Sequence, residues 1–415
     1  MQWAEASLGS ICDDGQGLIK TGPFGSQLHQ SDYCVDGTPV VMPKDIVGGR
    51  LVDVSIARVS QEHIDRLAHH KLKAGDIVYG RRGDIGRCAL IRERESGWLC
   101  GTGCLRVSLG EGDVLPQYLF YYLNDPSVVA WISNQAVGAT MPNLNTGILR
   151  SIPVRYPPKG IQNRIVSILS AYDDLIENNT RRIEILEETA RRLYEEWFVQ
   201  FRFPGQESVE LKESELGPIP EGWVVSCLGD IAEEIREAVH PSSVSPDTPY
   251  IGLEHLPRRS ITLREWGSAD SVSSGKLFFR RGDVLFGKIR PYFHKVVIAP
   301  FSGICSSDTI LIRPKKDTFL GVVLCCSSSD KFVDYATQTS NGTKMPRADW
   351  KVLKNYPVLI PSGELLSDFN GLVLGLVNQA RNLMLKNVNL RAQRDLLLPK
   401  LISGEIDVSD IPMPT

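Results

Sequence analysis

The first half of this chain contains the stretch Gly75-Asp76-Ile77-Val78-Tyr79-Gly80-Arg81-Arg82, and the second half contains its counterpart, Gly282-Asp283-Val284-Leu285-Phe286-Gly287-Lys288-Ile289-Arg290. Each stretch joins a Gly-Asp turn, a short apolar run and a basic turn. Two more pairs of segments match: Trp3…Leu8-Gly9 with Trp223…Leu228-Gly229, and Gly138-Ala139-Thr140-Met141-Pro142 with Gly342-Thr343-Lys344-Met345-Pro346. The spacing between partners drifts along the chain, which predicts a diverged tandem duplication. A duplicated chain is suited to reading two things at a fixed separation.

Both halves have the same texture around these repeats. Gly, Pro and Asp interrupt short apolar runs, which indicates strands and turns, and each half ends in a Pro-containing strand and a long helical run. The fold class that we expect is α+β, with two mixed, mostly-β domains, two long helices and an internal pseudo-two-fold repeat. The expected segments are a first domain at 1–157, a spacer helix at 158–203, a linker at 204–222, a second domain at 223–361, and a second spacer helix with its tail at 362–415.

Apolar residues in the two helical runs alternate spacings of four and three, which is a heptad seam. The first seam contains Ile165, Leu169, Tyr172, Ile176, Asn179, Ile183, Leu186 and Leu193, and the second contains Phe369, Val373, Leu376, Leu383, Asn387, Leu390 and Leu397. An antiparallel coiled coil is the simplest packing of two such seams. In it, Asn179 and Asn387 either meet and fix the register or face solvent. Acidic residues such as Glu187 are expected on the solvated face.

The bulk composition is that of an ordinary globular protein, with 42% hydrophobic and 23% charged residues. Its net charge of −3 hides local basic surface, since Lys276 to Lys351 carries thirteen Lys and Arg against six Asp and Glu. The sequence contains neither an apolar run long enough for a membrane helix nor a signal-peptide pattern. Nine scattered cysteines point to reduced thiols, so we expect a cytoplasmic protein without a membrane partner.

Signatures of catalysis are missing from the sequence. Gly342-Thr343-Lys344 lacks the remaining residues of a phosphate-binding Walker loop, and the seven histidines are dispersed. Cys100 and Cys104 have no histidine cluster that would complete a zinc site. We therefore expect neither catalytic residues nor a metal in this chain.

The basic turns are the candidate binding elements, because Gly permits close backbone approach while Arg and Lys bind phosphates or guanine edges. The alternative is that each is a hairpin that only turns the chain. Recurrence in both halves favours DNA contact. The candidate DNA-binding residues are Gly22, Phe24, Ser26, Arg81, Arg82, Arg87, Thr140, Asn143, Lys288, Arg290, Tyr292, Lys295, Thr343, Lys344 and Arg347.

Several motifs together resemble the specificity (S) subunits of Type I restriction-modification systems. They are the Gly-x-Thr-x-Met-Pro-like loop, Ile152 to Gln162, Asp174-Leu-Ile-Glu-Asn-Asn179 with the long helix, Trp197 to Gly205, and the C-terminal Arg394 to Ile406. The resemblance covers essentially the whole chain. One departure is that Pro361 to Leu365 lacks the counterpart of Gln162.

This resemblance implies two target-recognition domains, each reading one half of a split double-stranded DNA sequence. The paired helices would act as a ruler and dock two methyltransferase subunits, while restriction subunits with translocase activity complete the complex. S-adenosylmethionine, ATP and magnesium would belong to those partner subunits, and this chain would bind no cofactor. A helix of forty residues spans about 60 Å, enough for successive major grooves. The alternatives are a self-sufficient nuclease or methyltransferase and a protein-binding coiled-coil adaptor.

Overall fold

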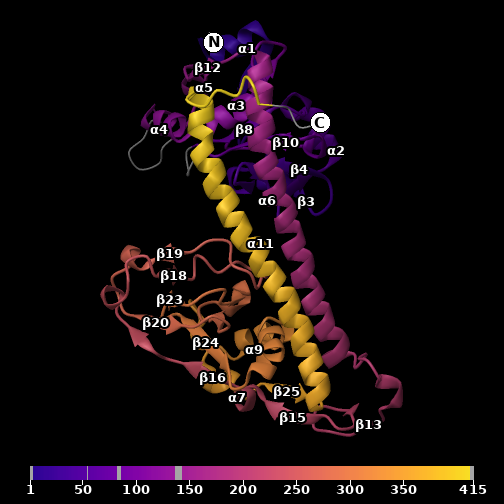
Figure 1. Cartoon of the computed structure of the whole chain (residues 1–415). Coiled ribbons are helices and arrows are strands. Elements are labelled where there is room, and N and C mark those ends of the chain that lie inside the picture. The colour runs from indigo at the N-terminus through magenta and orange to yellow at the C-terminus, as the bar shows by residue number, and fades with distance from the viewer. Residues whose placement is uncertain (1–2, 54, 82–85, 136–142, 412–415) are drawn as a thin grey trace. The chain divides into compact units, whose positions relative to one another are not determined.

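The computed structural model describes residues 3–53, 55–81, 86–135 and 143–411. The chain forms two compact units: unit 1 comprises residues 1–173 and 392–415, and unit 2 comprises residues 174–391. The two longest helices, α6 (Lys159–Tyr194) and α11 (Gly363–Ser403), contribute to both units. Two strand-rich units and two long helices confirm the expected fold class (Figure 1).

Unit 1 contains short strands and short helices ahead of α6. Its strands are β1 (Ala4–Ser7), β2 (Gln16–Thr21), β3 (Tyr33–Cys34), β4 (Thr38–Val41), β5 (Ile46–Val47), β6 (Arg50–Leu51), β7 (Ala57–Val59), β8 (Ile77–Gly80), β9 (Cys88–Leu90), β10 (Leu99–Cys100), β11 (Cys104–Gly110) and β12 (Pro153–Tyr156). Its short helices are α1 (Leu8–Asp14), α2 (Gln61–Arg66), α3 (Pro116–Leu123), α4 (Pro126–Gln135) and α5 (Thr146–Arg150).

Unit 2 repeats this plan between the two long helices. Its strands are β13 (Leu211–Lys212), β14 (Ile219–Pro220), β15 (Val224–Cys227), β16 (Ala232–Ile235), β17 (Ala238–Val239), β18 (Pro249–Ile251), β19 (Gly267–Ser268), β20 (Lys276–Phe279), β21 (Val284–Gly287), β22 (Val296–Ile298), β23 (Gly303–Cys305), β24 (Thr309–Pro314) and β25 (Pro357–Ile360). Its short helices are α7 (Leu228–Ile231), α8 (Leu320–Ser327), α9 (Asp330–Gln338) and α10 (Trp350–Leu353).

Sheet topology confirms the duplication. The order β2-β11-β8-β9 in unit 1 matches β16-β24-β21-β22 in unit 2, and all neighbours in both sheets are antiparallel. In each unit the first strand pairs with the last, β1 with β12 and β15 with β25. Each unit also pairs two strands in parallel, β4 with β10 and β18 with β23.

The repeated apolar strand is buried on both faces, which explains why it lacks polar residues. In β8, Ile77 and Tyr79 belong to one hydrophobic cluster and Val78 belongs to another. The same alternation occurs in β21, where Val284 and Phe286 face one core while Leu285 faces a second. The alternation follows from the two-residue period of a strand.

The Asp of each Gly-Asp turn is structural. Asp283 is buried, accepts from the backbone N of Arg280 at 2.7 Å, and forms two 2.7 Å contacts with the Arg313 guanidinium. Asp76 likewise accepts from the backbone N of Lys73 at 2.8 Å. These carboxylates fix the turns that lead into the central strands.

In unit 1, the start of α6 and the end of α11 share the core of the β8 sheet. Ile165 and Leu169 of α6 belong to the same cluster as Leu398 and Leu401 of α11. Gln162 is fully buried and bonds three backbone groups, the N of Leu115 and the O atoms of Asp113 and Pro157, at 2.7 to 2.8 Å. The sequence motif around Gln162 therefore serves packing.

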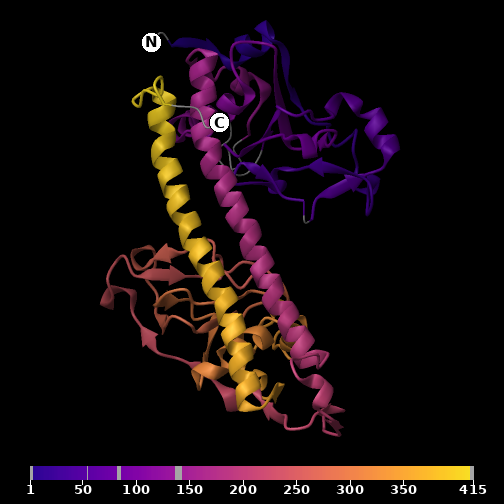
Figure 2. The same cartoon turned by 45° about the vertical axis from the view of Figure 1, so that its right-hand side comes forward.

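In unit 2, the two long helices run antiparallel, side by side in both views (Figures 1 and 2). The Trp197 ring lies 5.6 Å from the Phe369 ring, near the end of one helix and the start of the other. The seam is only partly followed, since Phe369, Val373, Leu383 and Asn387 are buried whereas Leu376, Leu390 and Leu397 are half-buried. Val377 and Leu398, the neighbours of Leu376 and Leu397, are buried instead, because α11 also packs in the hydrophobic core of each unit. On α6, Ile165, Leu169 and Asn179 are buried, while Tyr172, Ile176, Ile183, Leu186 and Leu193 are half-buried.

Candidate nucleic-acid interface

The candidate loops of unit 1 meet at one edge of its antiparallel sheet. Strand β2 ends at Thr21 and β8 ends at Gly80, while β9 begins at Cys88 and β11 begins at Cys104. Because neighbouring strands run in opposite directions, these four points lie at the same edge. The loops that carry Phe24, Arg81 and Arg87 therefore leave or enter the sheet together.

Arg81 ties three of these segments together. Its backbone N donates to the Gly103 carbonyl at 2.8 Å, and its own carbonyl accepts from the Leu144 N at 2.9 Å. Its guanidinium Nε donates to the Asn143 side-chain oxygen at 3.1 Å. Two other predicted residues, Arg82 and Thr140, lie outside the described residues.

Unit 2 repeats this hydrogen-bond pattern. The Lys288 N donates to the Asp308 carbonyl at 2.9 Å, and the Lys288 carbonyl accepts from the Ala348 N at 3.0 Å. The Arg290 N also donates to the Pro346 carbonyl at 2.7 Å. The basic turn and the Gly342–Arg347 loop, both singled out in the sequence, thus form one surface. Their contact could not be read from the sequence, because more than fifty residues separate them.

The basic side chains of this surface carry uncompensated charge. Thr343, Lys344 and Arg347 are exposed, and Lys288 and Arg290 are half-buried. Within the described part of the chain, neither Lys344, Arg347, Lys288 nor Arg290 forms an ion pair with a carboxylate. Free cationic groups beside an exposed ring, Tyr292 at 51% exposure, can bind phosphates and stack on bases.

Among its described residues, unit 1 has fewer exposed candidate groups than unit 2. Arg87 and Ser26 are exposed, as is Phe24 at 58%, whereas Arg81 and Asn143 are half-buried. Phe24 is the kind of exposed aromatic that stacks on a base or fills a groove.

Two predicted residues turn inward. Gly22 is buried, and an added Cβ would lie 2.0 Å from the Gly101 carbonyl oxygen, so packing alone explains the glycine. Lys295 directs its ammonium to the Leu253 carbonyl, and burial lowers its pKa. Direct DNA contact by these two residues remains a prediction.

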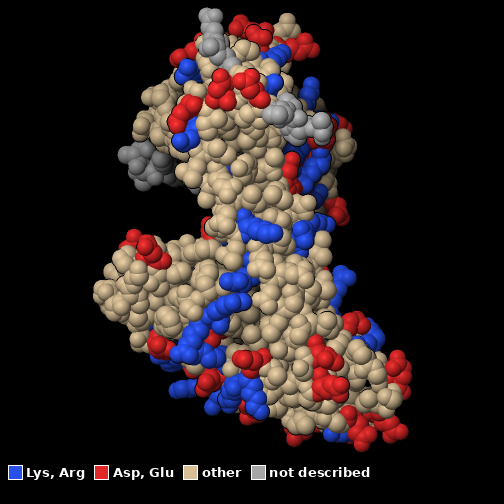
Figure 3. Space-filling model, viewed as in Figure 1, with Lys and Arg blue, Asp and Glu red and all other residues tan. Residues whose placement is uncertain are grey.

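Charge is distributed unevenly over unit 2 (Figure 3). Lys and Arg side chains form a band over β24 and β16 and beside α11, while Asp and Glu gather around β13. The linker sequence around β13 carries the acids Glu207, Glu210, Glu213, Glu215 and Glu221. Local basic surface on an acidic chain is compatible with phosphate contact.

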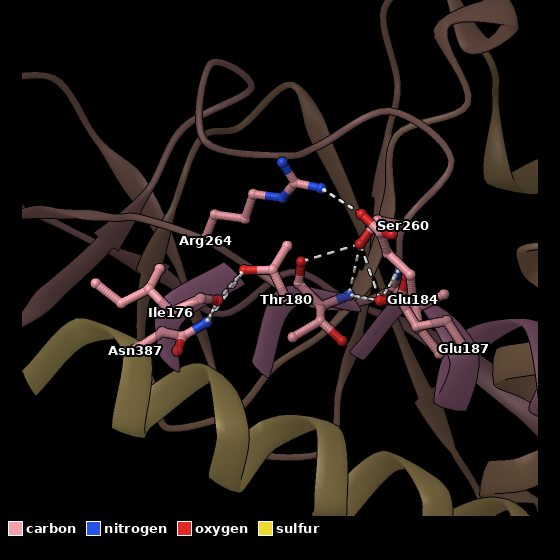
Figure 4. A network of polar contacts seen from close by, with 9 residues as sticks. Ile176, Thr180, Glu184, Glu187, Ser260, Arg264 and Asn387 are labelled. Atoms are coloured by element: carbon pink, nitrogen blue, oxygen red, sulfur yellow. Dashed lines mark hydrogen bonds and ion pairs between the residues drawn. The ribbon is translucent and has the colours of Figure 1, made fainter. Parts of the chain in front are cut away.

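Of the two alternatives for the seam asparagines, the structure shows that they meet. Asn179 Nδ2 donates to Asn387 Oδ1 at 2.9 Å, and both residues are buried. Asn387 Nδ2 reaches the Thr180 hydroxyl at 3.2 Å and the Ile176 carbonyl at 3.3 Å (Figure 4). A buried amide pair permits only one alignment of the helices in this unit, since any slip would leave both amides unpaired.

The expectation that Glu187 is solvated was wrong. Its side chain is 7% exposed, and its Oε1 accepts hydrogen bonds from the Ser260 hydroxyl at 2.9 Å and the backbone N atoms of Ile261 and Thr262 at 3.1 and 2.8 Å (Figure 4). Burial raises the pKa of this carboxyl. A loop of unit 2 covers this face of α6, and the heptad pattern carries no information about that cover.

The described residues show no sign of a metal site, a membrane helix or a disulfide. They contain no group of three or more His, Cys, Asp or Glu side chains arranged to hold a metal ion. None of the described helices is both long and apolar enough to cross a membrane. Seven of the cysteines are buried, and none forms a disulfide with another described cysteine. The pKa of Cys100 rises to about 12 by burial, which suits an inert thiol.

Comparisons with known proteins agree with this picture. A family model described as the Type I restriction modification DNA specificity domain matches residues 3–188. The MjaIX Type I restriction enzyme specificity subunit of Methanocaldococcus jannaschii is 24% identical, over 92% of this chain and 89% of that protein. The HindI specificity subunit of Haemophilus influenzae is 23% identical, over 87% and 93%. The crystal structure of a Type I restriction-modification S subunit from M. genitalium has the same fold, with a TM-score of 0.57 at 15% identity over 97% of this chain and 96% of that one.

Proposed function

We propose that this chain, which is similar to the specificity subunits of Type I restriction-modification systems, reads a bipartite DNA target, with one half read by each of its two units. In this role it supplies recognition and no catalysis. Its partners are double-stranded DNA and the methyltransferase and restriction subunits of the complex, two methyltransferase subunits in our proposal. S-adenosylmethionine, ATP and magnesium are bound by those partners, and the complex methylates adenine in the cytoplasm, where its DNA substrate lies.

One observation carries the proposal that both units read DNA. The same hydrogen bonds link a basic turn to a later loop in each unit, through Arg81 and Leu144 in one and Lys288 and Ala348 in the other. Two hairpins that only turned the chain would have no reason to preserve this junction together with its basic side chains. The two units share these backbone hydrogen bonds but differ in the side chains that the loops carry. This arrangement suits two units that bind different half-sites.

The chemistry of the loops supports DNA over a protein ligand. Lys and Arg side chains without carboxylate partners bind phosphates, and Arg reads the O6 and N7 atoms of guanine. The long helices suit the role of a spacer between the half-sites and of a dock for methyltransferase subunits. The antiparallel pairing and the buried amide pair in unit 2 favour a defined helix alignment.

The test changes one unit at a time in the complex of the full chain with its methyltransferase subunit. Arg81→Ala should weaken or relax recognition of one half of the methylated motif, and Lys288→Ala should do the same to the other half. The control is Lys331→Ala, which replaces an exposed residue on α9. If the replaced residue contacts a phosphate, its replacement by Ala should also reduce the slope of log affinity against log salt concentration by about one. Both variants altering the same half, or neither half, would contradict the assignment of one half-site to each unit.

A further inference from the structure

Arg258 was not among the residues predicted to bind DNA, yet it lies against the basic turn of unit 2. Its guanidinium carbon is 4.1 Å from the centre of the Phe293 ring, and that of Arg290 is 5.9 Å from the same ring. Phe293 belongs to a short 3₁₀ turn, Pro291–Phe293, within the basic turn. An aromatic ring close to two guanidinium groups orients both, since cations are attracted to its faces.

Arg258 has free hydrogen-bonding capacity. It is exposed, and no described carboxylate forms an ion pair with it. The next residue differs, because Arg259 pairs with Asp330 at 2.9 Å. An arginine whose position is fixed by stacking while its N–H groups remain unused is suited to bidentate contact with phosphate or guanine.

Two anchors hold the loop that carries Arg258. On one side, the backbone N of Arg259 donates to the His294 carbonyl at 2.8 Å. On the other side, Glu187 of α6 accepts hydrogen bonds from Ser260, Ile261 and Thr262 (Figure 4). Arg258 therefore stands directly beside a segment that is fixed both to the basic turn and to the long helix.

The backbone around this junction is strained. Arg259, Arg290 and His294 have φ values of 56°, 51° and 52°, and they make up three of the five non-glycine residues with positive φ that the described chain contains. Such conformations are unfavourable for side chains with a Cβ and persist where surrounding contacts enforce them. Here Arg259 adjoins Arg258, His294 adjoins Phe293, and Arg290 is itself one of the two arginines near the Phe293 ring.

We propose that Arg258 contacts DNA as part of the unit 2 reading surface, and that Glu187 is a positioning residue that holds the Arg258 loop against the basic turn. This inference rests on the proposed function of unit 2. It adds a third segment, from a part of the sequence with no repeat signature, to the two loops already described. It also makes the position of a reading loop depend on a residue of the long helix.

The first test measures binding of the full chain, purified with its methyltransferase subunit, to a labelled duplex that carries the motif methylated in cells. Arg258→Ala should lower affinity roughly 5- to 150-fold, the range for loss of one good bidentate contact, and leave the melting temperature unchanged. The matched control is Arg264→Ala, on the same loop. The Arg264 side chain is 61% exposed, and its guanidinium lies 4.0 Å from Glu184. Affinity of Arg258→Ala equal to that of the wild type would overturn the proposal. Failure of the wild-type complex to bind any such duplex would instead overturn the proposed function.

The second test separates positioning from general stability. Glu187→Ala should lose affinity, and combining it with Arg258→Ala should cause little further loss, because the loop is already displaced. Glu187→Gln keeps an acceptor oxygen and should retain most of the affinity, and Glu188→Gln, a neighbour on α6 that pairs with Arg191 and Arg192, is the control. Losses of Glu187→Ala and Arg258→Ala that multiply in the double variant would exclude the positioning role while leaving Arg258 as a contact.

Discussion

Gly22 shows how closely the backbone packs at the candidate reading edge of unit 1. A Cβ at this position would meet the Gly101 carbonyl oxygen at 2.0 Å, whereas a Cβ at Gly25, three residues later, would meet nothing within 4 Å. We expect Gly22→Ala to lower the free energy of unfolding by about 1–3 kcal/mol, the usual cost of overpacking, and Gly25→Ala to have little effect. Urea denaturation of the two variants measures this difference. Equal stability of both would show that the backbone relaxes freely at this edge.

Glu187 gives the protein a pH dependence with a defined sign. Burial raises the pKa of its carboxyl above the ordinary 4.5, so the folded state binds its proton more readily than the unfolded chain. Stability from this group therefore falls as the pH rises from 4.5 through the raised pKa. The free energy of unfolding of the wild type minus that of Glu187→Gln should decline across this window and then level off. A difference that grew with pH, measured by urea denaturation, would mean that hydrogen bonds to the carboxylate outweigh burial.

At the scale of elements, the paired amides of α6 and α11 in unit 2 can be tested by substitution. Asn387→Leu leaves the buried amide of Asn179 without its 2.9 Å partner and should cost about 1–3 kcal/mol of stability. Replacing both asparagines with leucine should restore stability, because two apolar side chains need no partner. Chemical denaturation of the single and double variants gives the comparison. Full stability of the single variant would show that the pair does not constrain the helices.

The sequence predicted those features that local patterns carry, but not those that depend on contacts between distant residues. The heptad spacing and the Gly-Asp repeats were local signals, and they predicted the long helices and the duplicated strands. They left open whether the two asparagines meet, because the spacing alone does not fix how the two helices are aligned. The fate of Glu187 was not predictable, because its partners are a hydroxyl and backbone N–H groups more than seventy residues away. Arg258 was missed for the same reason, since only the folded loop brings it to Phe293. Gly22 was predicted to bind DNA because glycine allows close approach of the backbone to a ligand, but glycine is equally needed where two backbone segments pack closely.

At the scale of the whole molecule, the spacer role predicts that helix length sets the distance between half-sites. Adding one heptad to both α6 and α11 lengthens each helix by about 10 Å, close to the rise of three base pairs. The methylated motif should keep both halves and gain a longer unspecified spacer. As the control, insertion of the same number of residues into the linker at 204–222 should leave the length of the DNA spacer unchanged. An unaltered spacer in the heptad variant would exclude the helices as the ruler.

The most direct measurement is adenine-methylation mapping, by long-read sequencing, of DNA from cells that carry this chain with and without its methyltransferase subunit. Two reading units predict one new motif that is split into two specified halves by an unspecified spacer of fixed length. Exchange of residues 1–157 for those of a Type I specificity subunit with a different target should then change one half only. A continuous motif, or no new methylation from an assembled complex, would contradict the two-unit reader.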